Sequence, residues 1–125
     1  MNNEKIVHTY KDLIVWQRAV ELSVQVYILT EQFPREELYG LVSQMRRASV
    51  SIASNIAEGR RRGTRPDFVN FLRIAYGSAA ELETQCIIAR RLPRMSNLDY
   101  TTVDGLLEEV QKMLVVMIRN INPNL

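Results

Sequence analysis

The sequence predicts an all-α protein, an antiparallel up-down-up-down four-helix bundle, and three observations support this fold class. Apolar residues recur at helical spacing in four stretches of about 20 residues each. Prolines and glycines fall mainly between these stretches, where helices begin and end. No alternation of apolar and polar residues is long enough to predict a strand, and short loops between helices favour antiparallel neighbours.

The first helix is expected over residues 13–32, after a tail formed by residues 1–11. Asp12 is suited to cap its start, because a side-chain oxygen at that position accepts hydrogen bonds from the first backbone N–H groups. Phe33 and Pro34 end it, since the residue before a proline is pushed away from helical angles. Two adjacent lines of residues are expected to face inward: Val15, Leu22, Val26 and Leu29, and beside them Trp16, Ala19, Val20, Ser23 and Tyr27.

The second helix is expected over residues 36–58. Glu36 and Glu37 lie at its start, where negative side chains interact favourably with the helix dipole. Gly59 is expected to end it, because glycine is the residue preferred just after a helix. The predicted core stripe consists of Leu38, Leu41, Val42, Met45, Ala48, Ile52 and Ile56.

The third and fourth helices are expected over residues 66–92 and 100–121, followed by a tail of residues 122–125. Pro66 suits the first turn of a helix, where its missing N–H costs nothing, and Pro93 stops the third helix. The third helix is expected to bury Phe68, Phe71, Leu72, Ala75, Ala79, Leu82 and Cys86. The fourth is expected to bury Val103, Leu106, Leu107, Val110, Met113, Leu114, Met117 and Ile121.

Length and composition indicate one globular domain over residues 1–125. A hydrophobic fraction of 46% with 24% charged residues is enough for a chain of 125 residues to bury its own core. The single cysteine, Cys86, excludes an internal disulfide and suits a reducing cytoplasm. The first residues show no signal-peptide pattern, and no apolar run approaches the roughly 20 residues that cross a bilayer. We therefore expect a cytoplasmic protein without membrane contact.

The first and fourth helices carry more apolar surface than one bundle interface covers. Residues 113–118 are apolar on every side of the predicted helix, and residues 13–16 are similar. An exposed apolar patch of more than a few hundred Å² usually marks an interface. We therefore expect a homo-oligomer formed through these two helices; scattered exposure of apolar residues on a monomer is the alternative. The expected interface residues are Trp16, Val115, Val116 and Ile118.

The sequence lacks the residue sets of common enzymes. His8, in the N-terminal tail, is the only histidine, so the Glu-x-x-His pairs of di-metal bundle enzymes are missing. No serine or cysteine has a histidine partner for nucleophilic catalysis, and no glycine-rich phosphate loop follows a strand. We therefore predict a protein that is not an enzyme, with no metal and no cofactor.

Three glutamates form the group that most resembles a catalytic or metal site: Glu58, Glu81 and Glu83. However, Glu81 and Glu83 lie about 200° apart around a helix, so they cannot share one inner site. Glu81 shares a helix face with Ser78. We predict a structural polar network between the second and third helices, and a metal or small-molecule site at Glu58 and Glu81 is the less favoured alternative. The network consists of Ser51, Asn55, Glu58, Ser78 and Glu81.

Residues 35–94 contain eleven arginines against six acids, and thirteen of the sixteen basic residues in the chain are arginine. Arginine favours bidentate contacts to phosphate. Arg90, Arg91 and Arg94 lie about 40 Å from the basic loop after the second helix, so they do not join it in one patch. Plain surface charge is the alternative to nucleic-acid binding, and base stacking is not predicted because the aromatic residues fall mostly on core positions. The candidate nucleic-acid surface is Arg46, Arg47, Arg60, Arg61, Arg62, Arg65 and Arg73.

Three segments carry a family resemblance: YKDLIVWQRAVELSVQVY, QMRRASVSIASNIAEGRRRG and FVNFLRIAYGSAAELETQCIIARRL, within about residues 10–92. The blocks S-I-x-x-N-I-A-E-G and G-S-x-x-E-L-E-T-Q are the most specific. The chain resembles the small bacterial four-helix-bundle proteins encoded in intervening sequences of 23S ribosomal RNA. It is also similar to the accessory variability protein of diversity-generating retroelements. Ala53 stands where the family commonly has proline.

The resemblance implies a bundle that assembles into a ring, commonly a pentamer, and it implies no catalytic residues. In the retroelement relative, a basic surface contacts nucleic acid and the reverse transcriptase. We therefore expect a non-enzymatic homo-oligomer whose basic surface binds RNA or DNA. The alternative is a protein–protein adaptor or scaffold that presents its basic loop to an acidic partner protein.

Overall fold

The computed structural model describes residues 9–121, and within them it contains four α-helices and no strand. The all-α class predicted from the sequence is confirmed. Three short helical turns precede the long helices: η1 (Tyr10–Asp12) before α1, and η2 (Arg35–Glu37) and η3 (Leu38–Val42) before α2. The long helices are α1 (Ile14–Thr30), α2 (Ser43–Arg62), α3 (Arg65–Arg91) and α4 (Thr101–Ile121).

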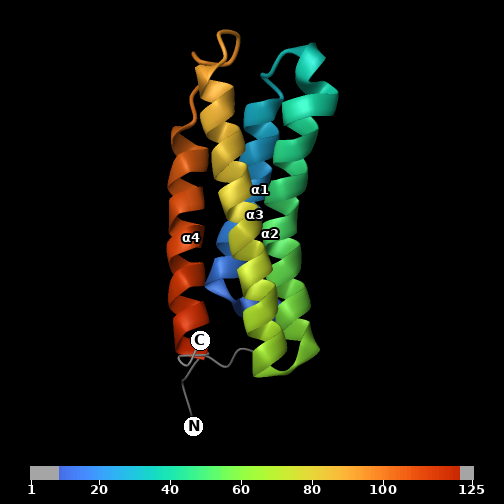
Figure 1. Ribbon diagram of the computed structural model, residues 1–125, viewed down its shortest axis with the longest axis vertical. Coiled ribbons are helices and arrows are strands. Elements are labelled where there is room, and N and C mark those ends of the chain that lie inside the picture. Colours follow the sequence, from blue (N-terminus) through green and yellow to red (C-terminus); the bar gives the residue numbers. More distant parts are fainter. Residues whose placement is uncertain (1–8, 122–125) are drawn as a thin grey trace.

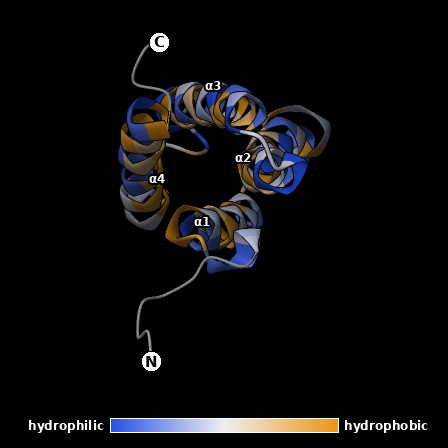
Figure 2. Cartoon of the chain, turned by 90° about the horizontal axis from the view of Figure 1, so that it is seen from below, coloured by the Kyte–Doolittle hydropathy of each residue, from blue (hydrophilic) through white to orange (hydrophobic). Residues whose placement is uncertain are grey.

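The four long helices pack around a common axis. α1 packs against α2 and α4, and α3 packs against the same two helices. Figure 2 shows this order around the axis, with α1 and α3 diagonally opposite. In Figure 1 the connections α1–α2 and α3–α4 lie at one end, and the connection α2–α3 lies at the other. The α2–α3 contact is the most extensive of the four.

Each helix buries one apolar face in the shared core, as the helical spacing predicts. Cys86 belongs to this core, and burial raises the pKa of its thiol to about 12, so the thiol stays neutral near pH 7. Tyr27 was expected to face the core, but it is 41% exposed and lies outside it. The largest fully buried side chains include Leu22, Met45, Ile52, Ile56, Leu72, Leu82 and Leu114.

The start of α1 differs from the prediction that Asp12 caps it. The Thr9 hydroxyl accepts from the N–H of Lys11 at 2.9 Å, and an Asp12 carboxylate oxygen accepts from the N–H of Thr9 at 3.3 Å. These two bonds form a capping box around η1, so Asp12 stabilises the short helix before α1. Leu13 is the residue at the N-cap of α1, and its side chain makes no cap hydrogen bond.

The second helix differs from the predicted range 36–58 at both ends. It begins seven residues later, at Ser43, because η2 and η3 occupy the preceding residues. Leu38, predicted in the core, is therefore 44% exposed. α2 continues to Arg62 and ends at Gly63, whose φ of 87° is left-handed and suits glycine.

Gly59, the predicted helix end, lies buried inside α2. A β-carbon at Gly59 would lie 2.6 Å from Cβ of Phe71 on α3, so this glycine permits close approach of the two helices. By contrast, α3 and α4 begin and end within one residue of the predicted ranges. No helix within residues 9–121 is long and apolar enough to span a membrane. Residues 1–8, which include His8, and the predicted tail 122–125 lie outside the described residues.

Candidate nucleic-acid interface

The basic cluster lies at the end of the bundle where α2 is followed by α3 (Figure 1). Arg60, Arg61 and Arg62 form the last turn of α2, and Arg65 is the first residue of α3. All four were expected on one loop; the helical position of the first three follows from the end of α2 at Gly63, and α3 begins at Arg65. Cations in a last helical turn interact favourably with the helix dipole, so they also stabilise the end of α2.

We call these four residues the basic end. Arg61, Arg62 and Arg65 are exposed, and Arg60 is partly buried. Arg61 lies with its guanidinium 5.8 Å from the centre of the Tyr10 ring. Arg62 donates from Nε to Glu58 at 2.9 Å and lies 5.0 Å from the centre of the Phe71 ring. The Arg65 side chain is exposed and forms no hydrogen bond or ion pair with any residue in the described part of the chain. Residues 60–65 contain no acid.

Arg46 faces α1 and is held by the end of that helix. Its Nε donates to the Thr30 hydroxyl at 2.9 Å, and its Nη2 lies 3.4 Å from the Tyr27 carbonyl oxygen. Its guanidinium is 4.4 Å from the centre of the Tyr27 ring. These contacts satisfy groups in the last turn of α1, so Arg46 acts as a structural link between α1 and α2.

Arg47 and Arg73 lie apart from the basic end. Arg47 forms an ion pair with Glu81 at 3.1 Å and donates to Gln44 at 2.7 Å, across the α2–α3 contact. Arg73 is exposed about 12 Å along α3 from Arg65. The seven predicted binding arginines therefore do not form one continuous band, and four of them gather at the basic end.

The arginines at the opposite end of α3 connect helices. Arg90 makes a bidentate contact with Asp104 of α4, at 3.0 and 2.6 Å, and lies 4.8 Å from the centre of the Tyr100 ring. Arg94 pairs with Glu36, and this hydrogen bond lowers the pKa of the Glu36 carboxyl. Because Asp104 and Glu36 offset the charges of Arg90 and Arg94, this end carries less net positive charge than the basic end.

The polar network between α2 and α3 has three of the five expected members. The hydroxyl oxygens of Ser51 and Ser78 lie 2.9 Å apart. The Asn55 amide donates to the carbonyl and hydroxyl oxygens of Ser51, at 2.8 and 2.9 Å. Glu58 and Glu81 were expected there too, but each carboxylate is about half exposed and pairs with an arginine, Arg62 and Arg47 respectively.

A second serine pair, which the sequence analysis did not identify, joins α1 to α2. The hydroxyl oxygens of Ser23 and Ser49 lie 3.1 Å apart, and Ser49 also donates to the Arg46 carbonyl oxygen at 2.9 Å. Ser49 is fully buried. The helical spacing placed Ser23 on an inward face, but it gave no means of pairing Ser23 with Ser49.

The carboxylates of the less favoured alternative do not assemble into one site. Glu58 and Glu81 bind different arginines on different parts of the α2–α3 contact. Among residues 9–121, no three histidine, cysteine, aspartate or glutamate side chains are grouped so that they could hold a metal ion.

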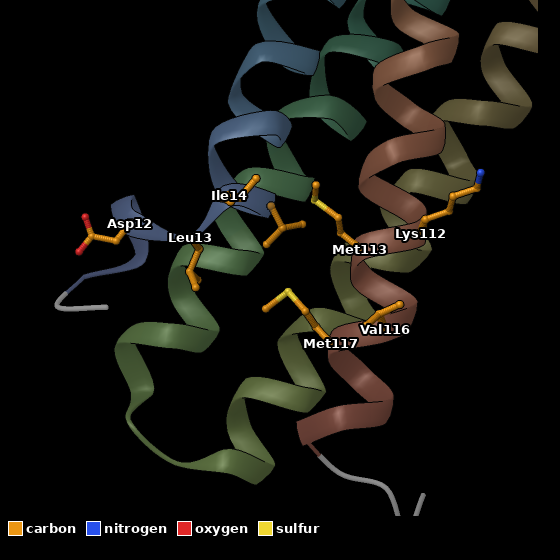
Figure 3. Close-up of a pocket in the computed structure, with 8 residues that line it drawn as sticks. Asp12, Leu13, Ile14, Lys112, Met113, Val116 and Met117 are labelled. Atoms are coloured by element: carbon orange, nitrogen blue, oxygen red, sulfur yellow. The ribbon is translucent and has the colours of Figure 1, made fainter. Parts of the chain in front are cut away.

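An apolar groove separates the start of α1 from the end of α4, as Figure 3 shows. It has a volume of about 590 Å³, and Met113 and Met117 extend into it from α4. Ile14 and Val116, one on each helix, are 55% and 53% exposed. Val115 and Ile118 of α4 are partly buried.

Trp16 lies apart from this groove. Its ring packs edge-to-face on Tyr10, with ring centres 5.2 Å apart. It precedes Ser23 by two helical turns, so it shares the face of α1 that contacts α2. Of the four residues of the expected interface, Val116 lines this groove, whereas Trp16, Val115 and Ile118 do not.

The fold and these surfaces define the class of the protein: a small helical bundle with a basic end and an apolar groove. The chain belongs to the 23S rRNA-intervening sequence protein family, whose model matches residues 11–116. The resemblance identified from the sequence motifs is thus confirmed.

A solved structure from Bacteroides thetaiotaomicron is similar to this chain; it is described as a protein of unknown function from the S23 ribosomal protein family. The TM-score is 0.76 at 26% sequence identity, over 85% of this chain and 96% of the other. No match was found among curated proteins.

Proposed function

We propose that this protein is a non-enzymatic homo-oligomer whose basic end binds the phosphate backbone of a nucleic acid, with RNA as the preferred partner. The observation that carries the proposal is the gathering of Arg60, Arg61, Arg62 and Arg65 within six residues at one end of the molecule. Guanidinium groups bind phosphate oxygens in bidentate geometry.

Two features make the basic end better suited to this role than the other arginines. The Arg65 side chain has no polar partner within residues 9–121, and Arg61 is exposed beside an aromatic ring. Arg46, Arg47 and Arg90, by contrast, would have to give up contacts that hold helices together. Binding a phosphate at the basic end therefore breaks fewer contacts between helices than binding one at Arg46, Arg47 or Arg90.

The proposed assembly is a ring of up-down-up-down bundles, a pentamer by resemblance to the family. Connections at alternating ends of the bundle support this topology (Figure 1). The groove between α1 and α4 supports an interface through Val116, with Ile14 in the place expected for Trp16. Val115 and Ile118 lie on the same helix but outside the groove. A ring would repeat the basic end once per protomer and so sum its electrostatic field. The single cysteine supports a location in the cytoplasm.

Salt-dependent binding of a structured RNA tests the proposal. The test variant is Arg60→Ser/Arg61→Ser/Arg62→Ser, and the matched control Arg35→Ser/Arg91→Ser/Arg94→Ser removes the same charge at the opposite end. Fluorescence anisotropy over a range of salt concentrations gives the slope of log K against log [salt]. The test variant should bind more weakly, and its slope should be less steep by about 2–3, because each lost phosphate contact reduces the magnitude of the slope by about one.

Two outcomes would overturn the proposal. Equal slopes for the test variant and the wild type would show that the basic end makes no phosphate contacts. A wild-type protein that binds neither RNA nor DNA at low salt would instead fit the alternative function, an adaptor that presents these arginines to an acidic protein.

A further inference from the structure

Beside the basic end, the chain segment before α1 forms a small hollow with the last turn of α2. Thr9 and Tyr10 of the first segment and Arg60 and Arg61 of α2 line this hollow, which has a volume of about 270 Å³. η1 packs against α2, and the capping box of Thr9 holds η1 in its helical turn. Residues about 50 positions apart in sequence are thereby brought to one site.

Tyr10 is fixed in place as one wall of this hollow. Its ring contacts the Trp16 ring edge-to-face, with the planes at 69° and the centres 5.2 Å apart. Its carbonyl oxygen accepts from the N–H of Leu13 at 3.0 Å, and the neighbouring Lys11 carbonyl accepts from the Gln17 side chain at 2.8 Å. These contacts hold an aromatic ring at the most basic part of the molecule.

The combination of a held aromatic ring and two arginines matches the chemistry of one nucleotide. Proteins bind single strands through a basic groove together with aromatic rings on which bases stack. The hollow is slightly smaller than the roughly 300–1,000 Å³ of drug-sized pockets, so it suits a single base with its phosphate. Bases in a duplex stack on each other and do not offer a free face.

We propose that this hollow is a subsite for one unpaired nucleotide of single-stranded RNA, which rests on the proposed function of the basic end. The base stacks on Tyr10, at the position over the ring where Arg61 lies in the free protein. Arg61 then turns to the adjoining phosphate, beside Arg60. The protein accordingly binds single strands and loops more tightly than duplexes of the same length.

Trp16 provides a direct readout, because it is the only tryptophan in the chain and contacts Tyr10. The probe is an oligouridylate of about ten nucleotides, within the roughly 4–16 nucleotides that one single-strand module covers. Its addition should change Trp16 fluorescence. The affinity should fall about five- to 150-fold in Tyr10→Leu, and the conservative variant Tyr10→Phe should stay within about twofold of the wild type.

The comparison separates failure of this subsite from failure of the basic end. Circular dichroism first verifies that both Tyr10 variants fold. If Tyr10→Leu binds oligouridylate as tightly as the wild type while the triple Arg60, Arg61 and Arg62 variant does not, the subsite is wrong and the basic end stands. If the wild type binds no RNA at all, both are wrong.

Two further ligands test the assignment to a single strand. Duplex RNA of the same length should bind more weakly than oligouridylate, and equal affinity would overturn the stacking role of Tyr10. Uridine monophosphate should bind more weakly still, because it lacks the neighbouring phosphates. Equal affinity for the free nucleotide would overturn the assignment and identify a mononucleotide pocket.

Discussion

At the scale of single residues, Gly59 and Gly77 are two helical glycines in opposite surroundings. A β-carbon at Gly59 would lie 2.6 Å from Cβ of Phe71, whereas one at Gly77 would meet nothing within 4 Å. Gly59→Ala should therefore lower the free energy of unfolding by about 1–3 kcal/mol through overpacking. Gly77→Ala should raise it by about 0.5–1 kcal/mol, because alanine favours the helix. Urea denaturation measures both; stabilisation by Gly59→Ala would contradict the close α2–α3 contact.

Gly59 also shows what local sequence leaves undetermined. Gly59 and Gly63 each suit the position after a helix, and the helix was predicted to end at the earlier one. The deciding interaction is with Phe71, which lies on another helix and twelve residues further along the chain. Tyr10 is a similar case. Its role depends on a contact with Arg61, and nothing in the segment around Tyr10 indicates this partner.

At the scale of the helices, the serine pair between α2 and α3 should behave as a coupled unit. Ser51→Ala or Ser78→Ala alone should cost about 1 kcal/mol of unfolding free energy, because each removes the part-buried hydrogen bond between the two hydroxyls. The double variant should cost less than the sum of the two, since both polar groups are then gone. A double-mutant cycle by chemical denaturation measures this coupling, and exposed Ser54→Ala serves as the control within about 0.5 kcal/mol of the wild type. Additive costs would refute the pair.

Helix ends that are marked by a proline were predicted more accurately than the start of α2, which has no such marker. Pro66 and Pro93 bound the third helix, and the prediction there was accurate to one residue. The approach to α2 has no such determinant. Glu37 accepts from the N–H of Leu41 at 3.4 Å, and Gly40 adopts φ −112° and ψ −111°, so a π-helical turn replaces the first turns of the expected helix. Apolar spacing alone extends through this turn and does not reveal it.

At the scale of the whole molecule, the charged and apolar surfaces lie on different elements. The basic end was predictable as a cluster, because Arg60, Arg61, Arg62 and Arg65 are neighbours in sequence. The separation of the other predicted arginines was not, because Arg46 and Arg47 face different sides of α2 and pair with groups of α1 and α3, respectively. Adjacent residues of a helix point about 100° apart, so sequence proximity does not place them on one surface.

The apolar groove between α1 and α4 leads to the last prediction, on the oligomeric state. Static light scattering at micromolar concentration should give a mass that is a multiple of the chain mass, and five times that mass for a pentamer. Val116→Glu and Ile14→Glu should each dissociate the oligomer, because an unpaired charge in a buried interface costs about 3 kcal/mol or more.

The matched control is Ile88→Glu, since Ile88 is 47% exposed on α3, outside the groove. This variant should keep the wild-type mass, which shows that added negative charge alone does not cause dissociation. The apolar interface should also persist at salt concentrations that release RNA, because phosphate contacts weaken with salt and apolar burial does not. A wild-type protein that is monomeric under these conditions would refute the interface, and the groove would then be apolar surface that a single bundle leaves exposed.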